Sequence, residues 1–323
     1  MITQQVAADI RMLFIGPKNF FIDILSYVPK TWAVYCVESV SDYLELPRNV
    51  NIILDASIRE VIDLSEKKFS DVNLIGCAST GTNHIKFSGR PTNTLKIISL
   101  RDIPEVLNKL TSAAEFSFGL LISLAKGLVP AVKSVESGVW NRSEFPGVIL
   151  KDKKLGLIGL GRIGSAMANF AESFGMSAVY YDPYLTSQTT PAIKCNSIKS
   201  LVSESDFVSL HVPYDKNKQV EPILTEDIFA SFKTGSFFIN TSRGELIDED
   251  GLIKALMSGR ILGAALDVLH DEPNILNNSI YKFANQTGAN VIFTPHIAGY
   301  SMENVRIATN AILNKILKIN FEK

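Results

Sequence analysis

The chain has 323 residues, 46% of them hydrophobic, which is enough for two domains that each bury a core. Its 32 basic and 33 acidic residues give a net charge of -1, so no general electrostatic field attracts nucleic acid or an anionic membrane. Three widely spaced cysteines without a CxxC pair argue against a disulfide framework or a zinc ribbon and favour a reducing, cytoplasmic setting. The apolar runs at residues 12–15 and 118–125 are too short for a signal peptide core or a membrane span.

The first hundred residues alternate short apolar stretches with mixed or helical ones. Such alternation is typical of an α/β domain built on a parallel sheet. We predict strands at residues 13–16, 33–37, 52–54, 72–76 and 95–98, and helices at residues 20–27 and 58–69.

A polar loop of small residues, 77–85, follows the fourth of these strands. Ligands of open α/β sheets collect beyond the carboxyl ends of the strands, and small residues leave backbone amides exposed to a carboxylate. Ser79, Thr80 and Gly81 are therefore candidate substrate-binding residues. The alternative is a solvated turn, which the loop taken alone fits at least as well.

A long apolar helix begins where the first alternation stops. The sequence Ser112-Ala113-Ala114-Glu115 has the form of a capping box, which predicts Ser112 as the N-cap of a helix over residues 116–128. The alternative for Glu115 is a contact with a ligand. The first crossing between domains is expected near Lys109. Residues 134–153 are irregular but carry bulky groups, which indicates a surface arm or a partner contact.

The sequence Gly159-Leu160-Gly161-Arg162-Ile163-Gly164 has the form of a dinucleotide-binding turn. A predicted strand at residues 154–158 precedes it, and a predicted helix at 163–174 and strand at 178–181 follow. Gly159 permits the tight turn, Gly161 lets the backbone approach phosphates, and Gly164 lets the helix lie close to the strand. The phosphates of the ligand would lie on the free amides at the helix N-terminus.

Asp182 ends the second strand, 23 residues after Gly159. A carboxylate there accepts hydrogen bonds from both ribose hydroxyls and repels a 2'-phosphate, which favours NAD over NADP. The alternative is a glycine-rich turn of another kind, with Asp182 beginning an Asp-Pro turn.

The rest of the chain extends the same sheet and then returns to the first domain. We predict strands at residues 207–211, 236–240, 263–268 and 291–293, a connecting helix at 249–258, and a last helix at 302–319 that crosses back.

Three polar residues, Arg243, Glu272 and His296, follow strands of this second sheet. A nicotinamide carries hydride but not the accompanying proton, so a dehydrogenase needs a separate acid/base, and histidine suits that role. A carboxylate such as Glu272 would favour the imidazolium, and the fork of Arg243 matches the carboxylate and carbonyl of a 2-oxo acid. His211 is expected to border the cofactor.

Other chemistries lack their motifs. No two of the four histidines have the HExxH spacing, and the His270-x-Glu272 pair has no PCxxC partner, so no metal site is expected. No GxSxG elbow supports serine hydrolysis.

The chain resembles the D-isomer-specific 2-hydroxyacid dehydrogenase family over nearly its full length. The similar motifs are the glycine turn, Asn240-Thr241-Ser242-Arg243-Gly244, Asp267-Val268 through Glu272-Pro273, and Thr294-Pro295-His296-Ile297-Ala298-Gly299, in the family's order. The resemblance implies two doubly wound α/β domains, with a Rossmann NAD domain at residues 110–296 inserted into a flavodoxin-like substrate domain at 1–109 and 297–323. It implies catalysis in the cleft between them.

The resemblance also implies the site residues and partners. Arg243, Glu272 and His296 would be catalytic, a small 2-oxo or 2-hydroxy acid the substrate, and NAD the cofactor of a cytoplasmic homodimer joined through the NAD domain. No nucleic acid, membrane or metal, and no extra regulatory domain, is expected. The cofactor is expected to contact Gly159, Gly161, Arg162, Ile163, Gly164, Asp182, His211, Val212, Pro213, Thr241, Ser242 and Asp267.

One departure concerns Lys86, because many members carry an acidic residue there, and this puts the local contacts of the substrate loop in doubt. The leading hypothesis is a reductase of 2-oxo acids, or a dehydrogenase of D-2-hydroxy acids. The alternative is an NAD(H)-sensing binding protein of the corepressor type on the same fold. Formate dehydrogenation is disfavoured, since that branch has Gln where this chain has Glu272.

Overall fold

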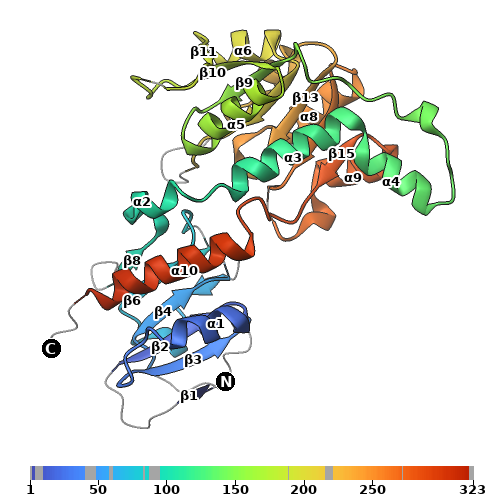
Figure 1. Cartoon of the computed structure of the whole chain (residues 1–323). Coiled ribbons are helices and arrows are strands. Elements are labelled where there is room, and N and C mark those ends of the chain that lie inside the picture. The colour runs from blue at the N-terminus through green and yellow to red at the C-terminus, as the bar shows by residue number, and fades with distance from the viewer. Residues whose placement is uncertain are drawn as a thin grey trace. The chain divides into compact units, whose positions relative to one another are not determined.

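The computed structural model describes residues 2–3, 10–40, 49–57, 61–82, 84–86, 95–187, 189–214, 221–270 and 272–319. The chain divides into two compact units, which we call the N-terminal unit (residues 1–110 and 301–323) and the central unit (residues 111–300). Each is built on a parallel sheet with helices, which confirms the predicted α/β fold class (Figure 1).

The N-terminal unit contains a six-stranded sheet in the order β1-β3-β2-β4-β6-β8. All neighbouring strands are parallel except β1, which pairs antiparallel with β3. Without β1 the order is that of flavodoxin-like sheets, 2-1-3-4-5. Its elements are β1 Ile2–Thr3, β2 Arg11–Ile15, α1 Lys18–Leu25, β3 Ala33–Val37, β4 Ile52–Asp55, β5 Ile62–Asp63, a 3-10 turn Lys67–Phe69, β6 Leu74–Cys77, β7 Ile85–Lys86, β8 Lys96–Ile98, a 3-10 turn Leu100–Asp102, α2 Pro104–Leu107 and α10 Met302–Leu317.

The five strands predicted for this region are present, with small shifts of their ends. The helix predicted over residues 58–69 is wrong. Residues 58–60 lie outside the described residues, and the remainder forms strand β5 and a 3-10 turn. Strand β5 pairs with β7, where Ile62 stands opposite Ile85 and Asp63 opposite Lys86. The pairing partner comes from more than twenty residues away in the sequence, so local spacing could not reveal it.

Both faces of this sheet are covered. Helices α1 and α10 lie over one face (Figure 1), where Phe14, Phe21 and Leu54 pack with Ile312 and Ile316 of α10. The opposite face buries a second cluster that includes Phe69 and Cys77. A β-carbon added to Gly76 would lie 2.4 Å from Cγ2 of Ile312, so α10 lies directly on the backbone of β6. The last helix of the chain therefore completes the first core.

The central unit contains a seven-stranded parallel sheet in the order β11-β10-β9-β12-β13-β14-β15. Strands are added outward from β9, first toward β11 and then in the other direction from β12 to β15. This is the 3-2-1-4-5-6 order of dinucleotide-binding sheets, extended by one strand. Its elements are α3 Ser112–Lys126, α4 Leu128–Glu136, a 3-10 turn Arg142–Glu144, β9 Lys154–Ile158, α5 Arg162–Ser173, β10 Ser177–Tyr181, β11 Ile193–Lys194, α6 Ile198–Glu204, β12 Phe207–Leu210, α7 Glu226–Ala230, β13 Ser236–Asn240, a 3-10 turn Gly244–Leu246, α8 Glu249–Met257, β14 Ile261–Leu266, a 3-10 turn Ile275–Asn277, α9 Ser279–Thr287 and β15 Val291–Phe293.

The capping box predicted at Ser112 is wrong. Helix α3 begins at Ser112 itself, its N-cap is Thr111, and no side chain caps it. The hydroxyl of Ser112 instead donates to the carbonyl oxygen of Ala298 at 2.9 Å. The competing acceptor lies 186 residues away in sequence, which explains why the local pattern misleads. Glu115 is exposed in the first turn of the helix.

Residues 134–153 are only partly irregular, since α4 extends to Glu136 and a 3-10 turn follows at Arg142–Glu144. Helix α4 and the segment after it extend away from the sheet of the central unit (Figure 1). Among the described residues no single helix is long and apolar enough to cross a bilayer. One bent pair, Pro104–Lys126 with Leu128–Glu136, meets the criteria of length and composition.

The contact between Gly76 and α10 gives a stability test. We expect Gly76→Ala to lower the free energy of unfolding of the N-terminal unit by about 1–3 kcal/mol, because the added methyl meets Ile312 and Ile316. Ile312→Ala alone should cost about 2–5 kcal/mol. The double variant should lose less than the sum, since the smaller side chain leaves room for the methyl. Urea unfolding followed by the fluorescence of the buried Trp32, in a Trp140→Phe background, measures all three, and additive losses would contradict this packing.

Candidate active site

The glycine turn between β9 and α5 is tightly packed at its first and last glycines and open at the middle one. Gly159 has a φ of +90°, and a β-carbon there would lie 2.5 Å from the carbonyl oxygen of His211. A β-carbon on Gly164 would lie 2.2 Å from the carbonyl oxygen of Gly159. A β-carbon on Gly161 would have no neighbour within 4 Å. The turn is therefore folded onto the sheet, while its middle residue faces open space.

Helix α5 begins at Arg162 with Gly161 as its N-cap, and no side chain caps it. The amides of a first helical turn and the helix dipole both favour an anion. The absence of a β-carbon at Gly161 leaves room for a ligand to reach this backbone. The chemistry and the shape of this cradle fit a pyrophosphate. Ile163 is partly buried against the core of the unit, which anchors the same turn.

Asp182 combines the two roles considered from the sequence. Its Oδ1 accepts a hydrogen bond from the amide of Tyr184 at 3.0 Å, which is the local turn expected of an Asp-Pro sequence. Its Oδ2 accepts from the amide of Leu160 at 3.1 Å, inside the glycine turn. The side chain is half-buried. The carboxylate thus lies beside the turn, where a ribose hydroxyl could reach it.

His211 follows β12 and lies against the glycine turn. It is 9% exposed, and its Nε2 is 2.8 Å from the hydroxyl of Ser209. Its Nδ1 is one of the few buried side-chain atoms in the described part of the chain that lack a hydrogen-bond partner. Burial lowers the pKa of His211 to about 3, so the ring is neutral at physiological pH and is not a proton donor. Val212 is partly buried beside it, and Pro213 is exposed.

Asn240, at the end of β13, holds the turn that carries Arg243. Its side-chain oxygen accepts from the amide of Ser242 at 2.9 Å, and its side-chain amide donates to the carbonyl of Arg243 at 2.9 Å. The hydroxyl of Ser242 donates to the carbonyl of Leu210 at 2.7 Å, which ties the turn to β12. The buried Thr241 shares a 2.7 Å hydrogen bond with Ser117.

The guanidinium of Arg243 donates to the carbonyl of Ser242 at 2.6 Å and is half-buried. A β-carbon on the next residue, Gly244, would lie 2.2 Å from the carbonyl carbon of Leu269. The turn after β13 is thus in backbone contact with the loop after β14, which carries Glu272. This contact brings Arg243 into the neighbourhood of Glu272.

Asp267, at the end of β14, organises the segment that carries His296. It is 1% exposed, and its Oδ1 accepts from the hydroxyl of Thr294 at 2.6 Å and the amide of Ile297 at 2.8 Å. Its Oδ2 accepts from the amide of Ala298 at 2.8 Å. His296 lies between these donors with a φ of +55°, a left-handed conformation that is uncommon for a non-glycine residue. The buried carboxylate thereby fixes the backbone on both sides of His296.

The structure brings His296, Glu272 and Arg243 together. Nδ1 of His296 is hydrogen-bonded to Oε1 of Glu272, and the two side chains are 31% and 35% exposed, so both are partly open to solvent. Burial raises the pKa of Glu272, but the hydrogen bond and charge of His296, the amide of Leu269 and the charge of Arg243 outweigh it and lower the pKa below its usual value. Glu272 is therefore an ionised acceptor. Asp271, beside it, lies outside the described residues.

The candidate substrate loop belongs to the N-terminal unit, after β6. The hydroxyl of Ser79 donates to the carbonyl of Gly81 at 2.7 Å, and Thr80 and Gly81 are half-buried. Asn83, in the same loop, lies outside the described residues. Lys86, which stands where many members of the family carry an acidic residue, lies opposite Asp63 in the β5–β7 pair. It therefore has an oppositely charged neighbour.

Three residues of the site were not foreseen: Asn240, Ser117 and Thr294. Of these, only Asn240 could have been predicted from the sequence, because an Asn after a buried strand and before small polar residues is typical of a side-chain-stabilised turn. Ser117 and Thr294 meet their partners only through the fold.

The comparisons with known proteins agree with this geometry. The family model for the NAD binding domain of D-isomer specific 2-hydroxyacid dehydrogenases matches residues 118–298. The chain belongs to this family.

The dehydrogenase family includes relatives of similar and of greater length. The glyoxylate reductase of Thermofilum pendens is 32% identical over 308 residues, which cover 93% of this chain and 86% of that protein. The D-3-phosphoglycerate dehydrogenase of Methanocaldococcus jannaschii is 32% identical over 264 residues, covering 81% of this chain. That alignment covers 47% of the relative, so the chain spans about half its length.

Solved structures of the dehydrogenase family share the fold. The NAD complex of the D-isomer specific 2-hydroxyacid dehydrogenase from Lactobacillus delbrueckii superposes with a TM-score of 0.70 at 22% identity, covering 95% of this chain and 96% of that one. The NAD-dependent formate dehydrogenase of Staphylococcus aureus superposes with a TM-score of 0.78 at 19% identity, covering 96% of each. The cofactor itself is identified as NAD by the match to the NAD binding domain model, with which the open glycine cradle agrees.

The glycine turn gives a paired test of this cofactor site. Gly161→Ala should leave stability unchanged, because its β-carbon meets no protein atom, but should weaken NADH binding about tenfold, about 1.4 kcal/mol, by crowding the ligand. Gly164→Ala should instead destabilise the fold by about 1–3 kcal/mol, because its β-carbon meets the carbonyl of Gly159. Titration with NADH and urea unfolding measure the two effects. Normal NADH affinity in a folded Gly161→Ala protein would contradict the placement of the phosphates.

Proposed function

We propose that this protein interconverts a small 2-oxo acid and its D-2-hydroxy acid with NAD, using His296 as the proton donor and acceptor. One observation carries the proposal: the imidazole of His296 is hydrogen-bonded to an ionised Glu272, in the neighbourhood of Arg243, in the unit that has the glycine turn. A dehydrogenase needs these groups together, because the alcohol proton and the hydride leave by separate routes.

Each side chain has one proposed task. His296 donates a proton from Nε2 to the carbonyl oxygen during reduction and takes it back during oxidation. Glu272 accepts from Nδ1, which fixes the orientation of the ring. Arg243 binds the carboxylate of the substrate and polarises its carbonyl. Bound NADH supplies the hydride that the protein cannot provide.

The residues proposed to hold NAD surround the ends of the strands of the central unit. Asp182 supports a preference for NAD over NADP, since a carboxylate repels a 2'-phosphate. Asp267 accepts hydrogen bonds from the backbone around His296, so any contact it makes with the cofactor adds to that role. The remaining proposed contacts are those of Gly159, Gly161, Arg162, Ile163, Gly164, His211, Val212, Pro213, Thr241 and Ser242. In the N-terminal unit, Ser79, Thr80 and Gly81 are the proposed carboxylate binders.

The proposal is tested by steady-state oxidation of NADH with a panel of 2-oxo acids: glyoxylate, hydroxypyruvate, phosphohydroxypyruvate and bulkier acids. We expect at least one to be reduced to a product of D configuration, and comparison of kcat/KM identifies the preferred substrate. Absence of turnover with the whole panel, together with partner binding that responds to NADH, would support the sensor instead. The relatives differ in their named substrates, and the panel covers that range.

Replacement of the proposed acid/base should separate chemistry from binding. His296→Ala is expected to lower kcat by about 10²–10⁴-fold, since proton transfer by a positioned side chain contributes that much. NADH binding should persist, because the glycine turn is untouched. His270→Ala, which alters an exposed histidine of the same unit, is the matched control and should retain activity. An unchanged kcat in His296→Ala would remove this residue from the mechanism.

The carboxylate of Glu272 should set the pH range of reduction. The pKa of Glu272 lies below its usual value, so in the wild type this carboxylate stays charged across the neutral range. Its charge is lost only as the pH falls through that lowered pKa. In Glu272→Gln no group titrates at this position, so the loss of kcat as the pH falls through the pKa of Glu272 should disappear, and the maximal kcat should be smaller. The pH profile of kcat measures this. An acid limb that persists unchanged in Glu272→Gln would show that the ionised Glu272 is not required for reduction.

We propose a homodimer that forms through the NAD domain, with the predicted surface arm at residues 134–153 of the central unit as the contact. This segment exposes large apolar side chains, with Val135 at 53%, Trp140 at 89% and Ile149 at 70% exposure. Exposed apolar side chains of this size gathered in one segment are typical of a protein interface.

We also propose a cytoplasmic location, as the sequence predicts. All three cysteines are free thiols, which is typical of proteins in a reducing compartment.

A charge placed in the arm should prevent association. Trp140→Asp is expected to convert the dimer to a monomer in sedimentation velocity, because a carboxylate at the centre of an apolar interface loses its hydration. Leu276→Asp is the control, since Leu276 is 74% exposed on the same unit but outside the arm. A monomeric wild type, or a dimer that survives Trp140→Asp, would contradict the proposed interface.

A further inference from the structure

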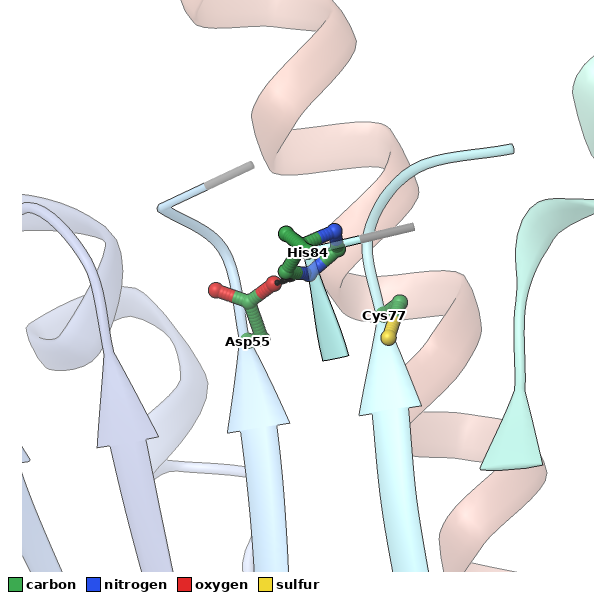
Figure 2. Close-up of side chains that lie close together, drawn as sticks. All are labelled: Asp55, Cys77 and His84. Carbon is green, nitrogen blue, oxygen red and sulfur yellow. Dashed lines mark hydrogen bonds and ion pairs between the residues drawn. The ribbon is translucent and has the colours of Figure 1, made fainter. Parts of the chain in front are cut away.

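The N-terminal unit contains a cluster of three potential metal ligands that the dehydrogenase chemistry does not use. Asp55 ends β4, Cys77 ends the neighbouring strand β6, and His84 follows the loop after β6. One ligand atom from each lies within 4.8 Å of the other two. Figure 2 shows the three side chains at the carboxyl ends of the two strands, with His84 drawn between the others.

The cluster is buried, and its charges are not balanced by a neighbouring lysine or arginine among the described ion pairs. Asp55 and Cys77 are fully buried, and the side chain of His84 is 12% exposed. Nε2 of His84 lies 2.8 Å from Oδ2 of Asp55. The other oxygen of Asp55 accepts from the amide of Ser57 at 3.0 Å and from its hydroxyl at 2.6 Å. Hydrogen bonds therefore orient the carboxylate, with Oδ2 turned toward the ring of His84.

The donor types and spacing fit a soft or borderline divalent ion. Thiolate, imidazole and carboxylate together are a zinc-type set, whereas Mg²⁺ and Ca²⁺ avoid sulfur. Metal–ligand bonds of about 2.0–2.3 Å put tetrahedral ligands roughly 3.3–3.8 Å apart. No two ligand atoms are more than 4.8 Å apart, so the longest distance must shorten by up to about 1 Å on metal binding. The 2.8 Å distance between Nε2 of His84 and Oδ2 of Asp55 must lengthen by about 0.5 Å.

The charge balance points the same way. A carboxylate and a thiolate together neutralise one divalent cation, which removes the cost of burying either anion alone. Without a metal, burial and the charge of Asp55 raise the pKa of the Cys77 thiol well above its usual value, so Cys77 is protonated and is not a nucleophile. Binding would release that proton to solvent.

We propose that Asp55, Cys77 and His84 form a binding site for a zinc-type divalent ion, with a fourth position left for water. No metal was expected from the sequence, because no two of the histidines have the HExxH spacing and His270-x-Glu272 lacks a PCxxC partner. Asp55 and Cys77 meet only through the β4–β6 pairing. The ion would link Cys77, at the start of the loop after β6, and His84, near its end, to Asp55 at the end of β4. Ser79, Thr80 and Gly81 lie between these two anchors, so the ion would rigidify the backbone of that loop.

Cobalt substitution tests the site without relying on activity. The chain is stripped with chelator and titrated with Co²⁺, which gives a thiolate-to-cobalt charge-transfer absorption only when a cysteine is a ligand. We expect one equivalent per chain, displaced by Zn²⁺, and a rise in the thermal midpoint on adding Zn²⁺. Cys77→Ser should abolish the absorption, and His84→Gln should weaken binding at least tenfold.

Cys36→Ser is the matched control, because Cys36 is also a buried cysteine of the N-terminal unit but packs in the other hydrophobic cluster. It should retain both the absorption and the affinity. The proposal is overturned if wild type shows no charge-transfer absorption, or if Cys77→Ser binds the ion as wild type does, which would indicate adventitious surface binding. Should Cys77→Ser fail to fold, His84→Gln decides, since its partly exposed side chain is the least disruptive to replace: unchanged affinity in that variant overturns the site.

Discussion

The arrangement around His296 depends on one buried carboxylate. Asp267 has almost no contact with solvent, and it accepts three hydrogen bonds from the segment after β15. Hydrogen bonds to an ionised acceptor are among the stronger ones in proteins, and leaving such an acceptor buried and unpaired is costly. The segment is therefore held in one conformation, including the left-handed backbone of His296. An uncommon φ of this kind persists because the surroundings determine it.

The parallel sheet supplies the second constraint. Strands β9, β12, β13, β14 and β15 all end at the same edge of the central sheet, so the loops that follow them are neighbours. Close backbone approaches then link those loops. Gly159 lies against His211, and Gly244 lies against Leu269, with too little space for a β-carbon in either place. The glycine turn and the His–Glu pair consequently belong to one framework of packed backbone.

The sequence was informative wherever the decisive contacts are local or follow from strand order. The strands at 236–240 and 291–293 are present as predicted, and the His296–Glu272–Arg243 grouping follows from their positions after parallel strands. It misled where a distant group competes. Ser112 donates to Ala298 instead of capping its own helix, and the supposed helix over 58–69 is partly a strand paired with β7. The Asp55–Cys77–His84 cluster had no signal in the sequence, since two of its members meet only because β4 and β6 are neighbours.

The position of α10 also bears on how the chain matures. The central unit is continuous in sequence and can complete its core as soon as residue 300 has left the ribosome. The sheet of the N-terminal unit cannot, because Val305, Ile312 and Ile316, which cover one of its faces, are synthesised only after the central unit. During translation one apolar face of this sheet therefore stays uncovered until α10 has been synthesised. That interval is when the nascent polypeptide is most in need of chaperone protection.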